Sequence, residues 1–198
     1  MSGIRLGADF LSTYEEGIKR EWVIGNGLGG YASSTVIGAG TRTYHGLLIA
    51  APENSPGRVL FLSSLDEEIS TGNENEEIYK LATHKYPDNI SPTGFDYLSE
   101  FIRNPFPLWI YQPGDFTIKK KVFMVHGNNT TFVLYDITSR KKEASLRIFP
   151  LVSSRDFNLT ARSGYLSFFQ RAGSMEVKLA SSNGFTFSLS SNMEYHSD

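Results

Sequence analysis

The chain has 198 residues, of which 40% are hydrophobic, 13% aromatic and 20% charged, and it contains no cysteine. This composition excludes a disordered segment, a disulfide scaffold and a collagen-like repeat, and a chain of this length buries about 70% of the surface that it exposes when unfolded. A formal net charge of −2 provides no broad positive field for a phosphate backbone, so we expect no nucleic-acid partner. Because the sequence has no long apolar run and no cysteine, we expect a cytoplasmic protein that contacts no membrane.

The first periodic segment runs from Phe10 to Trp22, where Tyr14, Ile18 and Trp22 recur at every fourth position. This spacing predicts an amphipathic helix, which Gly17 weakens. We expect at most this one short N-terminal helix in the chain.

The run Gly25 to Gly30, Gly-Asn-Gly-Leu-Gly-Gly, satisfies the dinucleotide-binding pattern G-x-G-x-x-G and follows the apolar residues Trp22 to Ile24. That binding site requires a helix after the last glycine, whose N-terminal amides hold the pyrophosphate. The residues that follow, Tyr31 to Gly38, are instead rich in β-branched types and end in glycine. We therefore interpret the run as a glycine-rich turn between two strands.

The densest group of polar side chains is Thr41 to Leu48, Thr-Arg-Thr-Tyr-His-Gly-Leu-Leu. On a strand, Arg42 and Tyr44 would share one face and His45 would lie on the other, so a guanidinium and a phenol could face a sugar together. Alternatively, Arg42 and Tyr44 are buried and satisfy carboxylates and backbone groups inside the domain. The sequence leaves both alternatives open and favours the second.

Short apolar runs separated by Gly, Pro, Asn and Ser dominate the rest of the chain, which is typical of β-strands. Runs whose odd and even positions are both apolar predict strands that are covered on both faces, in the middle of a sandwich. These runs are Val59–Leu62, Val122–Val125 and Phe132–Tyr135. Runs with strict alternation predict antiparallel strands with one solvated face, and these are Ala144–Ile148, Met175–Leu179 and Phe185–Leu189.

Two further segments complete the pattern. Asp115 to Thr138 predicts a long hairpin with Gly127, Asn128 and Asn129 at its tip. The acidic run Asp66 to Glu68 predicts the end of a strand that leads into a solvated turn. Together these strands predict an all-β fold, an antiparallel β-sandwich.

Candidate groups for chemistry are numerous but not paired. Glycoside hydrolysis requires two carboxylates that face each other across one bond. The candidate carboxylates are Asp66, Glu67, Glu68, Asp96, Glu100 and Asp156, and their spacing selects no pair. The histidines His45, His84, His126 and His196 lack metal-ligand spacing, so we expect no metal and no cofactor. We interpret Arg155-Asp156 as an ion pair or a turn.

The run Glu21 to Ala32, followed by Thr35 and Thr41 to Leu48, closely resembles the N-terminal domain of bacterial and archaeal glycogen debranching enzymes. Further matching pieces are Gly57-Arg58, Leu65–Glu67, Pro92–Phe95, Phe101, Pro107–Trp109, Lys121–Val125, Asn129–Thr131, Tyr135, Pro150-Leu151 and Arg155-Asp156. In one departure, Phe157 is followed by Asn158 where the family usually has a histidine.

The resemblance implies a large antiparallel β-sandwich, a supersandwich of the galactose mutarotase type, that extends as one domain over residues 1–198. It implies that a separate (α/α) toroid domain of the same polypeptide hydrolyses the α-1,6-glucosidic branch points of glycogen. The catalytic carboxylates would belong to that toroid, so we expect no catalytic residue in this chain. The partners that it implies are the toroid and α-glucan.

The candidate sugar-binding residues are Trp22, Asn26, Arg42, Tyr44, His45 and Trp109. Sugars stack their apolar faces on aromatic rings, so an independent glycan-binding module needs at least one exposed ring among Trp22, Tyr44, Trp109 and Tyr111. A purely structural scaffold would instead bury the Arg42-Tyr44-His45 run with internal hydrogen bonds. A mutarotase-like enzyme on a similar sandwich is the third alternative.

Overall fold

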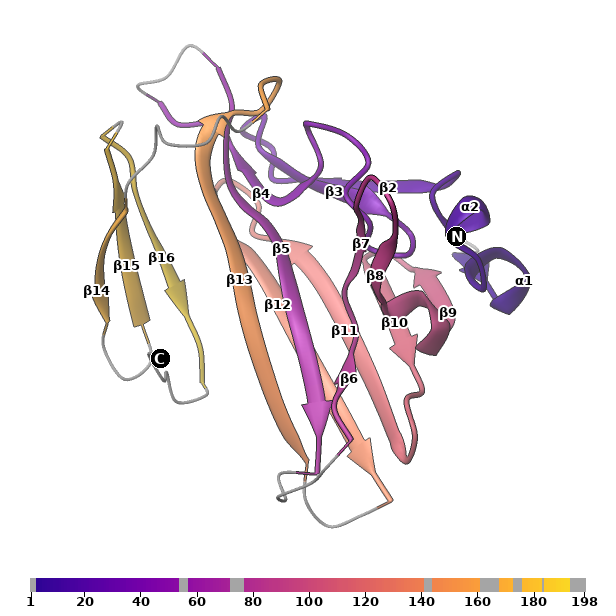
Figure 1. The fold of residues 1–198 in the computed structure, drawn as a ribbon. Coiled ribbons are helices and arrows are strands. Elements are labelled where there is room, and N and C mark those ends of the chain that lie inside the picture. The colour runs from indigo at the N-terminus through magenta and orange to yellow at the C-terminus, as the bar shows by residue number, and fades with distance from the viewer. Residues whose placement is uncertain are drawn as a thin grey trace.

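The computed structural model describes residues 3–53, 57–71, 77–140, 144–160, 168–172, 176–182 and 184–192. Most elements in this part of the chain are β-strands, and two large sheets face each other across a shared core (Figure 1). The expected all-β antiparallel sandwich is confirmed.

The first sheet has five antiparallel strands in the order β1-β9-β10-β11-β12. Their bounds are β1 Ile4–Leu6, β9 Leu98–Arg103, β10 Pro107–Tyr111, β11 Phe116–Met124 and β12 Thr131–Ser139. Strands β11 and β12 form the expected hairpin, with Phe116 opposite Ser139 and Met124 opposite Thr131. Gly127 at its tip has a φ of +74°, a conformation that glycine adopts without steric cost.

The second sheet has the order β13-β5-β4-β3-β2, and the short β6 pairs with β5. The bounds are β2 Glu21–Gly25, β3 Tyr31–Thr35, β4 Gly46–Ala50, β5 Val59–Ser70, β6 Tyr79–Lys80 and β13 Ser145–Asp156. The turn from Gly25 to Gly30 joins β2 to β3, as the sequence predicted. Asp66 to Glu68 lie close to the end of β5, which continues to Ser70, and they pair with β13; residues 72–76 of the expected turn lie outside the described residues.

A third sheet, β14-β15-β16, lies beside the second sheet (Figure 1). Its bounds are β14 Phe168–Ala172, β15 Glu176–Ser181 and β16 Thr186–Ser190, and a separate pair consists of β7 Thr83–Lys85 and β8 Ile90–Thr93. Phe61 of β5 contacts Phe185 and Phe187 at centroid distances of 5.6 and 5.0 Å. The third sheet therefore covers part of the outer face of the second. Exposure alternates along β15 and β16, as the sequence predicted for strands with one solvated face. Met175, the first residue of one predicted run, lies outside the described residues.

The helices differ from the expectation. Two four-residue helices, α1 Ala8–Leu11 and α2 Tyr14–Gly17, replace the predicted helix over Phe10–Trp22, and a 3₁₀ turn, η1, spans Gly94–Tyr97. The predicted helix was wrong beyond Gly17 because the next residues pair with β3 as strand β2. A Cβ at Gly17 would lie 2.3 Å from Ile37 Cγ2, so glycine allows α2 to lie against Ile37. None of the helices in the described ranges is long and apolar enough to cross a membrane.

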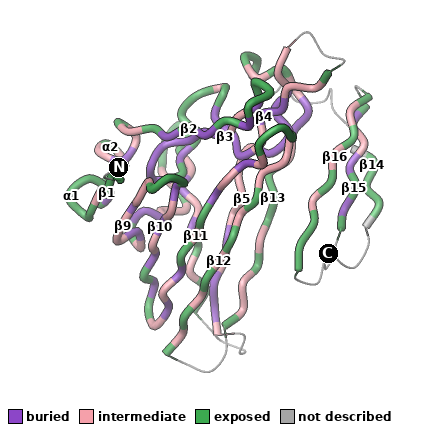
Figure 2. The backbone as a smooth tube through the Cα atoms, turned by 180° about the vertical axis from the view of Figure 1, so that it is seen from behind, coloured by how far each residue is buried: buried purple, intermediate pink, exposed green. Residues whose placement is uncertain are grey.

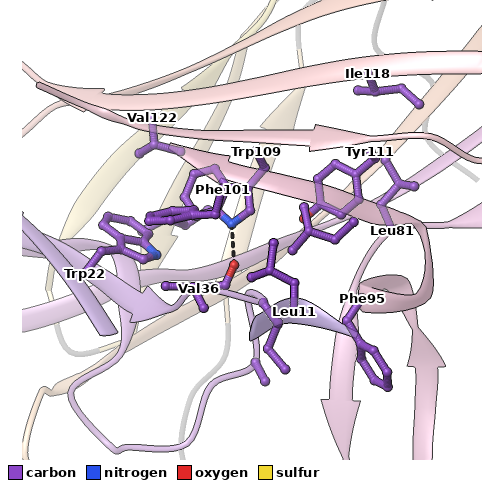
Figure 3. Packing of buried hydrophobic residues seen from close by; sticks show 14 of the residues in the cluster. Leu11, Trp22, Val36, Leu81, Phe95, Phe101, Trp109, Tyr111, Ile118 and Val122 are labelled. Carbon is purple, nitrogen blue, oxygen red and sulfur yellow. Dashed lines mark hydrogen bonds between the residues drawn. The ribbon is translucent and has the colours of Figure 1, made fainter. Parts of the chain in front are cut away.

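The core lies between the two large sheets. Trp22 of β2 and Trp109 of β10 meet edge to face at a centroid distance of 5.3 Å, and Phe101 of β9 lies 5.2 Å from Trp109 (Figure 3). Trp109 Nε1 donates a hydrogen bond of 2.7 Å to the Val36 carbonyl, which fastens the first sheet to the second (Figure 3). Buried residues concentrate on β3, β4 and the first half of β5, whereas β2 alternates between exposed and buried positions and β12 between half-buried and exposed ones (Figure 2).

Not every run that is apolar at both odd and even positions lies in the middle of the sandwich. Val59 to Leu62 are all buried, as expected. The run Phe132–Tyr135 was interpreted wrongly, because it belongs to the edge strand β12, and Phe132 and Leu134 are exposed on its outer face. Period-two patterning identified the strand but did not show whether its second face is covered.

Candidate functional site

Several of the segments that carry the family resemblance contribute to a group of turns that we call the loop cluster, residues 25–30, 41–45, 51–53, 57–58, 125–130 and 156–159. Asn26, which is fully buried, donates from Nδ2 to Asn129 Oδ1 at 2.9 Å and to the Asn128 carbonyl at 3.0 Å. Asn129 also exchanges two hydrogen bonds of 3.1 Å with the backbone of Ala51. These two amides therefore tie together three loops that are far apart in sequence.

The glycine run packs against this network. A Cβ at Gly30 would lie 2.6 Å from Asn26 Nδ2 and 2.8 Å from Asn129 Oδ1, so a larger residue would have to displace these amides. Gly27 has a φ of +82°, and its missing side chain leaves room for the His126 ring. The glycines are thus explained by close packing of loops rather than by approach to a phosphate.

The Arg42-Tyr44-His45 group lies on a turn, because β4 begins only at Gly46, so the strand placement expected for this segment was wrong. Arg42 Nε donates a hydrogen bond of 2.7 Å to Glu21 Oε1, and the Arg42 side chain remains about half exposed. His45 is buried: Nδ1 accepts the Thr41 amide, and Nε2 lies 3.6 Å from Glu21 Oε1. Burial lowers the pKa of His45, and Glu21 partly opposes this shift.

The aromatic candidates divide sharply by exposure. Trp22, Trp109 and Tyr111 are 2–4% exposed in the core, whereas Tyr44 is 38% exposed. Tyr44 is therefore the ring of these four that offers a surface to a ligand, with Arg42 beside it in the chain. The structure places Trp22, Asn26, His45 and Trp109 inside the protein, where their contacts are internal.

Two residues connect the Tyr44 turn to the loop that follows β13. Arg155 donates from Nη2 to the Thr43 carbonyl at 2.7 Å, and from Nη1 to the carbonyls of Asp156, Phe157 and Leu159. Tyr31 donates its hydroxyl to the Tyr44 carbonyl at 3.2 Å, and its ring meets Phe157 at 6.5 Å. Arg155 therefore makes a turn, as expected, and it also positions a second turn.

An open hollow of about 550 Å³ lies next to this contact. It is lined by Leu28, Gly29, Ala51, Pro52, Gly57, Arg58, Asp156, Phe157 and Asn158. Arg58 Nε donates to the Gly29 carbonyl at 2.5 Å, and its guanidinium lies over the Tyr31 and Phe157 rings at 5.7 and 5.4 Å. Sequence reasoning did not select Arg58 as a site residue, because nothing in its neighbourhood indicated that it would line the same hollow as Asp156.

The sequence also did not indicate that Glu67 and Lys120 form a buried ion pair. Glu67 of β5 is 2% exposed and faces the first sheet, where Lys120 Nζ and the Tyr135 hydroxyl both lie 2.5 Å from Oε1. Burial and the neighbouring Glu67 raise the pKa of Tyr135 well above its ordinary value. This cluster borders a cavity of about 40 Å³ between the sheets, which has room only for water-sized molecules. It therefore joins the two layers and presents no surface to a glycan.

The other candidate carboxylates have separate partners. Asp66 lies 2.8 Å from His84 Nε2, and this hydrogen bond raises the pKa of His84. Glu68 pairs with Lys80 and Arg147, and Glu100 pairs with Arg5. Among the residues that the structure describes, no three histidine, aspartate or glutamate side chains gather as a metal site would require. Within the described part of the chain, Asp66, Glu68 and Glu100 therefore each have a basic partner of their own.

Comparison with known proteins identifies the family of this chain. A search of curated proteins found no match, and a search of solved structures found none either. The family model described as "Glycogen debranching enzyme N terminal" matches residues 20–198, which include the loop cluster, both large sheets from β2 onward and the third sheet. The chain therefore belongs to the family of glycogen debranching enzyme N-terminal domains.

Proposed function

We propose that this chain is a non-catalytic domain that supports the catalytic domain of a glycogen debranching enzyme and contacts α-glucan at the loop cluster. The observation that carries the proposal is the exposed Tyr44 ring beside Arg42, held by Tyr31 and Arg155 on a surface built from the family-like segments. The parent enzyme would hydrolyse α-1,6-glucosidic branch points with carboxylates outside this chain.

Co-sedimentation of the 198-residue chain with glycogen tests the glycan contact. Tyr44→Ala should lower retention about tenfold, because it removes the exposed ring and leaves in place the hydrogen bonds that the Tyr31 and Ser33 hydroxyls donate to the Tyr44 carbonyl. Tyr86→Ala is the matched control, since Tyr86 is 53% exposed but lies outside the loop cluster. Equal retention by Tyr44→Ala and wild type would contradict the assigned contact.

Branch-point hydrolysis tests the supporting role. The activities to compare are those of this chain, of a separately expressed catalytic domain and of their mixture. Higher activity in the mixture than in the catalytic domain alone supports the proposal. Hydrolysis by this chain alone would overturn the non-catalytic assignment.

A purely structural scaffold is the second candidate, because Trp22, Asn26, His45 and Trp109 make internal contacts. This function predicts that wild-type chain is not retained by glycogen but still raises the activity of the catalytic domain. The two experiments together therefore separate the candidates.

A further inference from the structure

We propose that the hollow between Arg58 and Asp156 binds one pyranose unit of a saccharide through two neighbouring hydroxyl groups. The choice of α-glucan as that saccharide rests on the proposed function, whereas the site itself follows from the two side chains and their surroundings. The hollow is separate from the Tyr44 ring and from all six residues selected by sequence.

Arg58 is held in place before any ligand arrives. Its Nε donates a hydrogen bond to the Gly29 carbonyl, and its guanidinium carbon lies 5.7 Å from the Tyr31 ring centroid and 5.4 Å from that of Phe157. The terminal nitrogens of Arg58 make no hydrogen bond to the described residues. Because the side chain is already ordered, binding through these nitrogens costs little rotamer entropy.

Asp156 is fixed in a similar way on the other side. Its Oδ1 accepts a hydrogen bond of 2.8 Å from the Asn158 amide, while Oδ2 points toward Gly57, 3.5 Å from the position that a Cβ would occupy there. Both Arg58 and Asp156 line the hollow, but no nitrogen of the first lies within 4.0 Å of a carboxylate oxygen of the second. Arg58 and Asp156 thus share one hollow without pairing with each other, although Asp156 interacts electrostatically with the neighbouring Arg155.

A vicinal diol matches this arrangement. A guanidinium only donates and a carboxylate only accepts, whereas each hydroxyl does both. One sugar hydroxyl accepts from Arg58 and its neighbour donates to Asp156, so both charges gain a hydrogen-bonded partner and the ligand needs no charge of its own. A simple anion satisfies Arg58 but is repelled by Asp156, and a simple cation has the reverse difficulty.

The walls of the hollow suit a sugar ring. Leu28, Pro52 and the half-buried Phe157 ring supply apolar surface, and the Asn158 side chain adds a polar group at the edge. The volume of about 550 Å³ lies within the range of about 300–1,000 Å³ found for ligand pockets. Arg58, which lines the hollow, lies over the Tyr31 ring at 5.7 Å, and the Tyr31 hydroxyl donates to the Tyr44 carbonyl, so Tyr31 links the hollow to the Tyr44 turn.

The test is a titration of the ¹⁵N-labelled 198-residue chain with maltoheptaose, followed by NMR. The amide resonances of Gly29 and Asn158 should shift on binding. Asp156→Asn and Arg58→Gln should each raise the dissociation constant for maltoheptaose at least tenfold. Asp156→Asn retains an acceptor for the Asn158 amide, so it is the variant expected to keep its fold, and thermal unfolding checks this. Asp136→Asn is the control, because Asp136 is an exposed carboxylate on β12 with no part in the hollow.

The outcomes separate this proposal from the proposed function. Unchanged affinity in a folded Asp156→Asn variant overturns the site, while loss of glycogen retention in Tyr44→Ala would still support the glycan contact of the domain. Absence of any saccharide binding by wild type overturns both. Inorganic phosphate that shifts the same amides, is lost in Arg58→Gln and binds more tightly in Asp156→Asn would show an anion site and overturn the diol assignment.

Discussion

Replacing Lys120 with methionine tests whether the buried ion pair holds the two layers together. Lys120 lies on the inner face of β11, opposite Trp109 on one side and Tyr135 on the other, and its side chain is only 12% exposed. In Lys120→Met, the Glu67 carboxylate would stay buried with the Tyr135 hydroxyl as its remaining side-chain partner. An unpaired buried charge of this kind costs about 3–5 kcal/mol.

This loss is large for a domain whose free energy of unfolding is about 5–15 kcal/mol, and it should lower the melting temperature by on the order of 10 °C. Urea unfolding followed by tryptophan fluorescence measures it directly, because the two tryptophans of the chain are both buried: Trp109 lies beside Lys120, and Trp22 packs against Trp109. Lys119→Met is the matched control on the same strand. Its exposed pair with Asp136 should contribute less than about 1 kcal/mol.

A double-mutant cycle completes the experiment. Adding Glu67→Leu to Lys120→Met removes the orphaned charge, so the double variant should be more stable than Lys120→Met alone. If Lys120→Met costs no more than Lys119→Met, the carboxylate is not held in the core by the lysine, and the reasoning fails.

Three further results are expected. Asn129→Ala removes three hydrogen bonds from the buried loop network and should lower the free energy of unfolding by about 2–4 kcal/mol in urea titrations; a loss below 1 kcal/mol would contradict that role. Gly30→Ala should destabilise by about 1–3 kcal/mol through overpacking, while Gly40→Ala, which has open space around it, should change the melting temperature little. The hydrogen bond to Asp66 raises the folded-state pKa of His84, so its stabilisation is fully present below the ordinary value of about 6.5 and is lost as pH rises through the higher folded value. The stability difference between wild type and His84→Gln should therefore shrink from pH 6 to pH 9, and a difference that grows over this range would show that the sign is wrong.

The candidate site shows where local patterns stop being informative. The sequence indicated that Tyr44 and Arg42 belong to a polar group, but it placed them on a strand, because alternation alone does not distinguish a strand from the turn before it. Tyr44 is exposed and His45 is buried because Tyr31, Glu21 and Arg155 come from other segments to hold the turn. Arg58 and Asp156, nearly a hundred residues apart, had no local feature that linked them.

The sequence by itself determined the all-β class, the β11–β12 hairpin, the glycine-rich turn at Gly25–Gly30 and the family resemblance. The first three features depend on the period of two and on backbone freedom at glycine, which are properties of neighbouring residues, whereas the resemblance depends on matching motifs along the chain. Only the tertiary structure decided that Glu67 is paired inside the core, that Phe132 lies exposed on an edge strand, and that Arg58 and Asp156 share a hollow. Burial and pairing depend on which distant strands and loops meet, so they are properties of the assembled layers rather than of any one segment.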